Sequence, residues 1–262
     1  MSNWDKGSYE VTAEQLAPVA PAVADAVEPV SGLATLDLAC GTGNEALELA
    51  RRVDEVTGLD GAPRLLEVAA ERASAENLDA NWVQGDLTEL PFEDDSFRIV
   101  TSVFGLIFTS SPQDSAREIR RVIEPEGRVA FTSWIEEGLF QHMQEMAKAA
   151  VASQFGQTPP AGDDAPFQWG DEVAVRELFS ESGIALQVYT RDLVIEEESA
   201  QLLNDRWFDH HPIWLTMKDV VGEDRYEELR RETLPVVEAA NEADDGSFRY
   251  TMRYLLFEGS PV

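Results

Sequence analysis

The chain has 262 residues, with 50 Asp or Glu against 20 Lys or Arg, so its formal net charge at pH 7 is −30. A field of this sign repels nucleic acid and anionic membrane surfaces, and no local basic patch interrupts it. The single cysteine, Cys40, excludes an internal disulfide and a cysteine-based metal cluster. An apolar share of 44% is ordinary for a globular protein, and the chain is long enough to build one sizeable core.

The sequence carries no membrane or export signal. No stretch approaches the roughly 18 apolar residues that a membrane span needs. The first residues, Met1 to Asp5, lack a basic start and an apolar run. We therefore expect a cytoplasmic protein without a membrane partner.

Residues 1–31 predict one or two short helices, because an alanine-rich segment there is interrupted by Pro18, Pro21 and Pro29. This segment is expected either to lie over the ligand-binding edge of the fold or to pack on its sheet.

A strand, a glycine turn and a helix follow. Thr35–Ala39 is short and apolar enough to be buried on both faces, and apolar residues recur at helical spacing from Glu45 to Val53. Between them, Gly41 and Gly43 allow a tight turn in which the backbone can approach a ligand with no Cβ in the way. The first N–H groups of a helix have no partner within it, so this turn predicts a site for an anionic or polar ligand end.

Strands and helices alternate as far as residue 135, which predicts an α/β fold with a parallel, doubly wound sheet. The predicted strands are 33–39, 55–60, 80–85, 97–104 and 128–135, and the predicted helices are 44–53, 62–77 and 112–123. Ser111 and Pro112 are a favourable start for the last helix. Ligands of such sheets bind beyond the carboxyl ends of the strands, where strand order reverses. This rule groups Asp37, Gly41, Asp60, Asp86 and Val103–Phe104 in one crevice.

After Trp134 the pattern changes. It predicts an amphipathic helix from Leu139 to Val151, a loop at 156–164, a helix from the cap Asp171 to Ser182, a strand at 186–195, two or three helices in 198–242 and a last strand at 248–257. No linker is long enough to separate domains. We expect a single domain, 1–262, with a helical segment at 1–31, a core at 32–136 and two helical lid excursions at 137–170 and 198–246.

The glycine turn is part of a longer series of motifs. The string Asp37-Leu38-Ala39-Cys40-Gly41-Thr42-Gly43 resembles the first motif of the class I S-adenosylmethionine-dependent methyltransferases. Further matches to that family, in the right order, are Val56–Asp60, Gln84–Leu87, Leu90–Phe92, Asp95–Val100 and Glu124–Val129, where Glu126 departs from the usual Pro-Gly-Gly. The resemblance is close over residues 30–136. Toward the end it is looser and is similar to small-molecule methyltransferases of the ubiquinone/menaquinone-biosynthesis (methyltransferase type 11) kind.

The resemblance implies a Rossmann-like, seven-stranded sheet with its last strand antiparallel and helices on both faces. It also implies S-adenosyl-L-methionine as cofactor. Asp60 would bind the ribose hydroxyls, Asp86 and Leu87 the adenine, and Asp37 would order the turn or reach the cofactor's amino group, while Tyr9, with Trp4 behind it, would close over the methionine end. The implied cofactor-binding residues are Tyr9, Asp37, Ala39, Cys40, Gly41, Thr42, Gly43, Asp60, Gly61, Gly85, Asp86, Leu87, Val103 and Phe104.

Cys40 sits in the turn where a small side chain is needed, and we interpret it as packing. A base is needed only if the methyl acceptor must lose a proton, and the candidates are His142, His210 and His211. His142 lies opposite the apolar stripe of its helix, and the other two stand before Pro212 at a predicted helix end, so surface and helix-end roles are the alternatives. No His, Asp or Glu cluster has metal-ligand spacing, and we expect no metal.

Both lid excursions are rich in large apolar side chains, which suits a pocket for a flat or apolar acceptor. The alternative is that these side chains form the lid's own core. The candidates are Phe140, Met143, Phe155, Phe167, Trp169, Trp207, Phe208, Trp214 and Met217. The sequence leaves open whether oxygen, nitrogen or carbon is methylated.

Two other functions fit part of the pattern. Gly41 to Ala46 satisfies G-x-G-x-x-G/A with Asp60 downstream, as in nicotinamide-dependent oxidoreductases, but this leaves Gln84–Leu87 and Leu90–Phe92 unexplained. A non-catalytic module that holds S-adenosylmethionine or its demethylated product would carry the same motifs. We predict a methyltransferase with a small-molecule partner, as a monomer or a homodimer.

Overall fold

The computed structural model describes residues 4–155 and 167–262. Its residues form two compact units. The first, which we call the sheet unit, comprises Leu16–Ile135, Gln168–Arg191 and Arg253–Val262, and the second, the helical unit, comprises Met1–Gln15, Glu136–Phe167 and Asp192–Met252. The predicted division into a core and excursions stays a prediction, but the N-terminal residues and both predicted excursions contribute to the helical unit.

The sheet has seven strands in the order β3-β2-β1-β4-β5-β7-β6. Their bounds are β1 Thr35–Leu38, β2 Val56–Asp60, β3 Asn81–Gln84, β4 Phe97–Ser102, β5 Ile123–Trp134, β6 Ile184–Glu197 and β7 Phe248–Pro261. The pairs of β1 with β2 and β4, of β2 with β3 and of β4 with β5 are parallel, and β7 is antiparallel to β5. The Rossmann-like sheet with an antiparallel last strand is therefore confirmed, and strand order reverses between β1 and β4.

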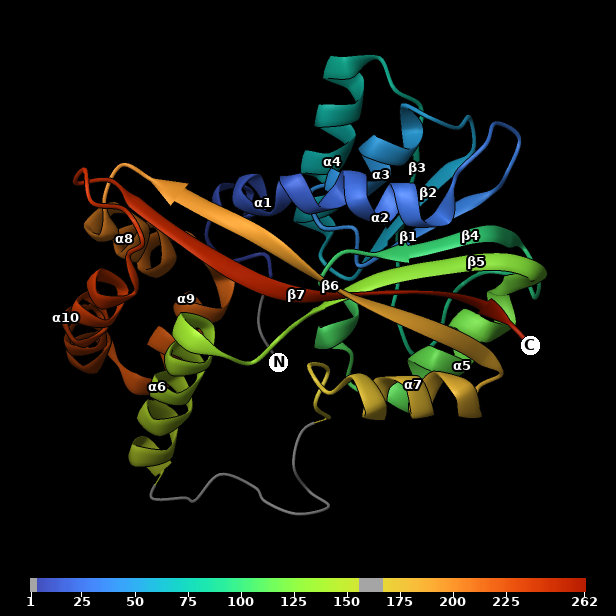
Figure 1. Ribbon diagram of the computed structural model, residues 1–262. Coiled ribbons are helices and arrows are strands. Elements are labelled where there is room, and N and C mark those ends of the chain that lie inside the picture. The colour runs from blue at the N-terminus through green and yellow to red at the C-terminus, as the bar shows by residue number, and fades with distance from the viewer. Residues whose placement is uncertain (1–3, 156–166) are drawn as a thin grey trace. The chain divides into compact units, whose positions relative to one another are not determined.

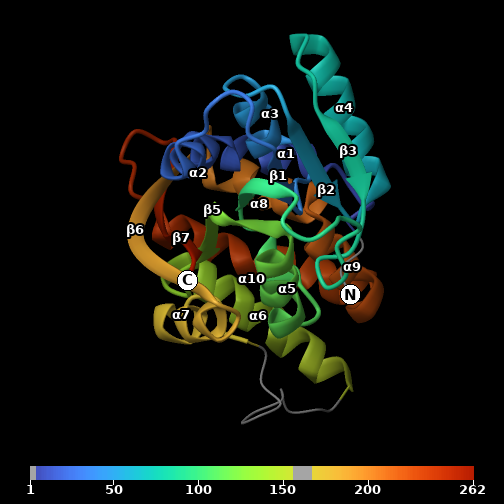
Figure 2. The same ribbon diagram turned by 90° about the vertical axis from the view of Figure 1, so that its right-hand side faces the viewer.

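Helices cover both faces of this sheet. α2 (Ala20–Val27), α3 (Asn44–Ala50) and α4 (Pro63–Glu76) lie on one face, and α5 (Pro112–Val122) and α7 (Glu172–Glu181) lie on the other (Figures 1 and 2). The predicted caps are present, because the Ser111 and Asp171 side chains accept hydrogen bonds from the first turns of α5 and α7. β1 is covered on both faces, and all four of its residues are buried, including the polar Thr35 and Asp37.

The segment before β1 forms two helices, α1 (Tyr9–Leu16) and α2, joined by a 3₁₀ turn at Ala17–Val19. Pro18 and Pro21 do not interrupt helices here but stand at helix starts, where the missing N–H is harmless. α2 packs against α3, β4 and β5. For this helix, packing on the sheet is therefore the correct one of the two predicted placements.

β1 and β4 end earlier than predicted for a conformational reason. β1 ends at Leu38 and β4 at Ser102, because Ala39 (φ 52°) and Phe104 (φ 54°) adopt the left-handed conformation and cannot continue a strand. β5, by contrast, begins five residues early, at Ile123. Its residues 124–127, predicted as a turn, bulge out of the ladder, since Phe97 pairs with Ile123 but Ile99 already pairs with Arg128.

The helical unit contains α6 (Gly138–Phe155), α8 (Ala200–His210), α9 (Pro212–Val221) and α10 (Glu223–Ala240). α10 packs against the other three, and α9 also packs against α6 and α8. The 198–242 excursion thus holds three helices, within the predicted range, while the predicted loop at 156–164 lies outside the described residues. Among the helices in the described ranges, none is both long and apolar enough to span a membrane.

Candidate functional site

The ends of β1 and β4 meet at the point where strand order reverses. Ala39 and Phe104, one residue or two beyond these strands, are both left-handed although neither is glycine. The Ser102 hydroxyl donates to the Leu38 carbonyl over 2.8 Å, and a Cβ on Gly105 would clash with the Ala39 Cβ. Strained backbone of this kind persists where the surroundings fix it, and it clusters at functional sites. The predicted site residues Ala39, Val103 and Phe104 lie here.

Two buried carboxylates hold the glycine turn. Asp60, at the end of β2, accepts from the Gly41 N–H with Oδ2 and from the Ala62 N–H with Oδ1, both over 2.8 Å. Asp37, in β1, accepts from the Ala46 N–H with Oδ2 over 3.0 Å. The predicted ordering role of Asp37 is thus seen as a bond to the first turn of α3.

The turn is also supported by residues that the sequence reasoning missed. Arg72, in α4, donates through Nη1 to the Thr42 carbonyl over 2.6 Å and to the Asn44 Oδ1 over 2.9 Å. The Trp82 ring lies over β2, where a Cβ on Gly58 would approach it to 2.6 Å. Arg72 follows the pattern of an exposed helix residue, and Trp82 lies in a short edge strand. Neither therefore gave a local signal of these contacts.

Some polar groups around the turn have no partner in the described residues. The N–H groups of Thr42 and Glu45 donate to none of the described atoms, although Thr42 and Glu45 are both 2% exposed. Among the acceptors, Asp37 Oδ1 and both Glu45 carboxyl oxygens are buried there without a hydrogen bond. Buried polar groups are nearly always paired, so these donors and acceptors mark where a ligand or ordered water is expected.

Burial perturbs the pKa values of the carboxyl groups at the turn. Burial raises the pKa of the Asp37 carboxyl well above its usual range, against the Ala46 hydrogen bond, which lowers it, and the Asp60 charge raises it further. Burial likewise raises the pKa of the Glu45 carboxyl, and the charge of Asp37 adds to the rise. Perturbed carboxyls in one place are frequent at functional sites.

Asp86, beyond β3, is exposed, and its Oδ1 accepts from the N–H (2.8 Å) and the hydroxyl (2.6 Å) of Thr88. The bond from the Thr88 hydroxyl lowers the pKa of Asp86, so this carboxyl stays ionised. Gly85 and the half-buried Leu87 flank it; a Cβ on Gly85 would lie 2.8 Å from Leu59. Gly61 follows Asp60 with room beside it, because a Cβ there would meet only the Gly85 carbonyl, at 3.6 Å.

Cys40 is buried, and its sulfur faces Gly58 of β2, where a Cβ would lie 2.9 Å away. Burial raises the pKa of the Cys40 thiol well above its usual range. A thiol that stays protonated is a poor nucleophile, which agrees with the packing interpretation.

Aromatic rings stand beside the end of β4. Phe104 stacks on Trp134 with a centroid distance of 3.6 Å and an interplanar angle of 5°, and Tyr254 meets it edge-on at 5.6 Å. Phe104 and Tyr254 are buried, whereas Trp134 is half-buried. The Phe104 N–H donates to the Thr132 hydroxyl over 2.9 Å, so the ring's position is fixed from the backbone.

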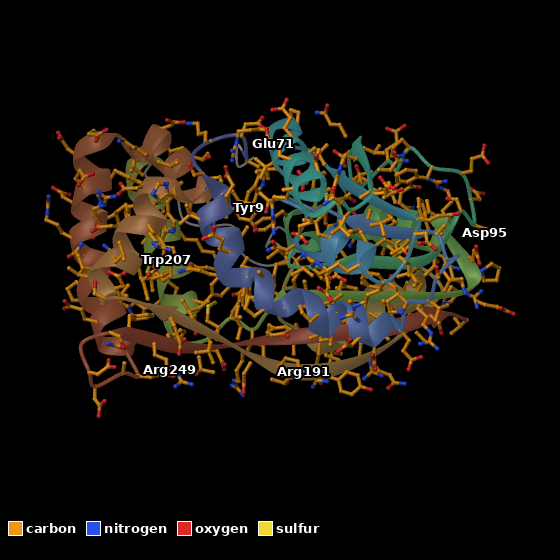
Figure 3. The ribbon with its side chains drawn as sticks, turned by 90° about the horizontal axis from the view of Figure 1, so that it is seen from above. Tyr9, Glu71, Asp95, Arg191, Trp207 and Arg249 are labelled. Atoms are coloured by element: carbon orange, nitrogen blue, oxygen red, sulfur yellow. The ribbon has the colours of Figure 1, made fainter. Side chains whose placement is uncertain are left out.

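Within the helical unit, the predicted residue Tyr9 lies beside Trp4 and His211. Trp4 and Tyr9 are 5.3 Å apart between ring centroids, and each is 6.2 Å from His211 (Figure 3 labels Tyr9). Ser8 donates to the His210 carbonyl over 3.1 Å, and Lys6 pairs with Asp219. The N-terminal residues are therefore docked on the junction of α8 and α9.

The three histidines occupy different environments. His142 is exposed on α6, and His210 is the last residue of α8. His211 caps α9, since its Nδ1 accepts from the Ile213 N–H over 3.2 Å, and burial lowers its pKa to about 4. Its ring is thus neutral near pH 7 with its only acceptor nitrogen in use, which makes it a weak general base. A catalytic role for any of the three stays a prediction.

Several residues predicted for an acceptor pocket are packed inside their own unit. Phe208 lies 4.6 Å from Trp214 and 5.0 Å from Tyr226 between centroids, as expected for a lid core. Trp169 belongs to the sheet unit, where it is buried edge-on to Phe131. Trp207 of α8 is half-buried (Figure 3). The pocket hypothesis is therefore weakest for Phe208, Trp214 and Trp169.

The sheet unit also has a surface depression of about 430 Å³, far from the glycine turn. Its lining comes from the turn before β4 and the C-terminal ends of α5 and α7: Asp94, Asp95, Arg117, Arg120, Arg121, Glu181 and Ser182. These lie at the amino ends of the strands, opposite the edge where ligands of α/β sheets bind. No His, Cys, Asp or Glu group in the described ranges has the arrangement of a metal site.

Comparison with known proteins agrees with this arrangement. Residues 35–127 match the family described as a methyltransferase domain. An uncharacterized protein of Mycobacterium tuberculosis is 30% identical over 204 residues, which cover 77% of this chain and 73% of that protein. A 2-phytyl-1,4-naphtoquinone methyltransferase of Trichormus variabilis is 41% identical over 100 residues, 36% of this chain and 44% of that protein.

Among solved structures, a putative methyltransferase of Bacillus halodurans superposes with a TM-score of 0.63 at 17% identity, covering 93% of this chain and 99% of that one. At this identity the similarity concerns the fold alone.

Proposed function

Because the chain belongs to a methyltransferase family, we propose that it binds S-adenosylmethionine at the glycine turn of the sheet unit and transfers the methyl group to a small, apolar or aromatic acceptor. The proposal names a cofactor site and an acceptor class, and each has its own support.

The observation that carries the cofactor site is the separation of donors from acceptors around the turn. Unpartnered N–H groups of Thr42 and Glu45 suit the carboxylate of the cofactor's amino-acid end. Asp60, Asp86 and the unpaired oxygen of Asp37 are acceptors, which suit the ribose hydroxyls, the adenine amino group and the ammonium group. The residues present therefore fit a ligand that carries all of these groups.

When bound, the cofactor supplies a methyl group that its sulfonium already activates for an in-line displacement. What remains for the protein is alignment and the exclusion of water. The strained ends of β1 and β4 and the hydrogen bond from Phe104 to Thr132 fix the backbone where the acceptor must approach. Rigid backbone at the reacting centre is what alignment requires.

The acceptor class is supported by the aromatic rings at this edge. Trp134, half-buried and stacked parallel to Phe104, brings a flat apolar ring to this edge. Offset stacking on such a surface favours planar aromatic molecules. The naphthoquinone substrate named for the Trichormus variabilis relative is compatible with this class but belongs to that protein.

The cofactor is tested by calorimetric titration of S-adenosylmethionine, S-adenosylhomocysteine and reduced nicotinamide dinucleotide into the purified protein. We expect saturable binding of the first two only. Asp60→Ala removes acceptors to two backbone N–H groups and to the ligand, so we expect at least roughly 100-fold weaker binding of S-adenosylhomocysteine.

Two further variants make this test specific. Asp86→Ala loses an exposed carboxylate and should weaken binding without unfolding the protein, whereas Asp94→Ala, at the opposite edge of the sheet, should bind as the wild type does. Binding of the nicotinamide alone would refute the cofactor assignment. Turnover with planar phenolic or quinol acceptors then separates an enzyme from a module that only binds the cofactor.

A further inference from the structure

We propose that Arg72 is a positioning residue that sets the glycine turn to receive the anionic amino-acid end of the cofactor. The inference rests on the proposed function, since it assigns to that site a residue outside the turn and outside every motif of the sequence. It starts from three contacts that a single side chain makes across the unit.

Arg72 belongs to α4 and is half-buried. Its Nη1 lies 2.6 Å from the Thr42 carbonyl oxygen, 3.2 Å from the Thr42 hydroxyl and 2.9 Å from Asn44 Oδ1. All three acceptors belong to the glycine turn or the first residue of α3. The guanidinium therefore binds three acceptors of the turn and of the first residue of α3.

The effect on the backbone can be followed one peptide at a time. The Thr42–Gly43 peptide is fixed at both ends, because its carbonyl accepts from Arg72 and its N–H donates to the Cys40 carbonyl over 2.8 Å. The Cys40–Gly41 peptide is fixed likewise, by that same Cys40 carbonyl and by the bond from the Gly41 N–H to Asp60. The peptide between them carries the unpartnered Thr42 N–H. Arg72 and Asp60 thus hold this donor from opposite sides of the turn.

Charge gives Arg72 a second effect. Asp37, Glu45 and Asp60 bring carboxyl groups to the same turn, and these disfavour an anionic ligand. A guanidinium stays protonated at every physiological pH, and here it is hydrogen-bonded to the turn that carries the unpartnered Thr42 N–H. It therefore shifts the potential at the turn in favour of a carboxylate. The adenosine part of the cofactor, which carries no carboxylate, gains nothing from it.

This difference between the two parts of the cofactor provides the test. S-adenosylhomocysteine and 5′-methylthioadenosine share the adenosine and thioether, but only the former carries the amino-acid end. Both are titrated into wild type, Arg72→Met and Arg72→Lys, with Arg117→Met as matched control, because Arg117 is an exposed helical arginine that pairs with Asp114 on its own helix. Thermal unfolding of each variant is recorded in parallel.

We expect Arg72→Met to weaken S-adenosylhomocysteine roughly tenfold and 5′-methylthioadenosine by less than about twofold, as for loss of a charge-assisted hydrogen-bond network. Arg72→Lys keeps the charge without the planar fork and should recover part of the affinity. Arg117→Met should change neither ligand. Asn44→Ala should lose less in the Arg72→Met background than alone, since the two side chains contact each other.

Equal losses for both ligands would assign Arg72 a purely structural role and overturn the inference, as would unchanged affinities. A wild type that binds neither ligand would instead refute the proposed function, and with it the inference. The two failures are distinguished by the wild-type titration alone.

Discussion

The two units of the molecule differ in how their buried acceptor groups are paired. In the helical unit, the Asn204 amide is bonded on both sides, to the Arg230 carbonyl and the Thr233 hydroxyl, and the Tyr226 hydroxyl donates to the Phe208 carbonyl. In the sheet unit, Asp37 and Glu45 keep buried carboxyl oxygens that have no partner within the described residues. Buried groups left unpaired cost free energy, so a chain keeps them where they serve another purpose.

The comparison shows where chemistry is to be sought. Titratable residues alone would direct attention to the histidines of the helical unit, yet His211 is used there as a helix cap. The buried carboxyl oxygens without a partner and the left-handed Ala39 and Phe104 are in the sheet unit. Three measurements test this difference between the units.

The largest effect is expected at His211. Burial lowers its pKa to about 4 from 6.5, so the unfolded chain binds a proton at higher pH than the folded one. Its contribution to stability is therefore complete above pH 6.5 and is lost as the pH falls toward 4, by up to about 3 kcal/mol. His211→Asn keeps a cap and removes the titration, so its free energy of unfolding, measured in urea between pH 4 and 7, should fall less steeply toward acid.

The same variant tests the contrast itself. If His211 is structural, His211→Asn retains the affinity for S-adenosylhomocysteine and the turnover of the wild type. A loss of turnover with intact stability at neutral pH would make His211 a catalytic residue and place chemistry in the helical unit.

Gly105→Ala should have the next largest effect. The new Cβ would clash with the Ala39 Cβ and lie 2.9 Å from the Ser102 hydroxyl oxygen, where β1 and β4 end. Overpacking of this kind costs about 1–3 kcal/mol and should displace the strained Ala39, so we expect both a lower unfolding midpoint in urea and weaker binding of S-adenosylhomocysteine. Gly61→Ala is the control for stability, since its Cβ would make only an ordinary contact at 3.6 Å. Equal midpoints for the two variants would show that the junction is not tightly packed.

Glu45→Gln should have the smallest effect. The folded-state pKa of Glu45 is raised, so its contribution to stability is complete below its unfolded pKa near 4.5 and is lost as the pH rises through the folded value. Removing the charge should therefore make the protein more stable than wild type at pH 8, by about 1 kcal/mol, and leave it similar at pH 4. Asp37 has a raised pKa too, so the slope should shrink without vanishing. A variant less stable at pH 8 would mean that ionised Glu45 has a stabilising partner.

Much of the sheet unit could be predicted because its signals are local. Asp37, Gly41, Gly43 and Asp60 lie within 24 positions of one another or of a strand end, and the alternation of strands with capped helices determines which edge they share. The left-handed Ala39 and Phe104 could not be predicted, because nothing in an alanine or a phenylalanine indicates positive φ. Their conformation follows from contacts between β1 and β4, which are far apart in the sequence.

Contacts from a distance also explain the other omissions. Arg72 lies some 30 residues after the turn that it binds, and in its own helix it looks like one more surface charge. For His211, the position at a helix end was predicted from the sequence. Its use as a cap through Nδ1 and its contacts with Trp4 and Tyr9 were not, because the contacts depend on how the N-terminal residues dock. Residue type and periodicity predict a helix or a strand, whereas the contacts of a side chain depend on residues that are distant in the sequence.

The position of β7 has a consequence for how the protein is made. β7 is inserted between β5 and β6, yet it follows both in the chain, and its Gly259 pairs with Val129 of β5. A ribosome therefore releases β6 with no neighbour to pair with, and the edge of β5 stays open until β7 has emerged. Closure of the sheet depends on contacts of long sequence separation, which form slowly. An unpaired edge during synthesis invites association with other chains, and the many negative charges of this sequence oppose it throughout that interval.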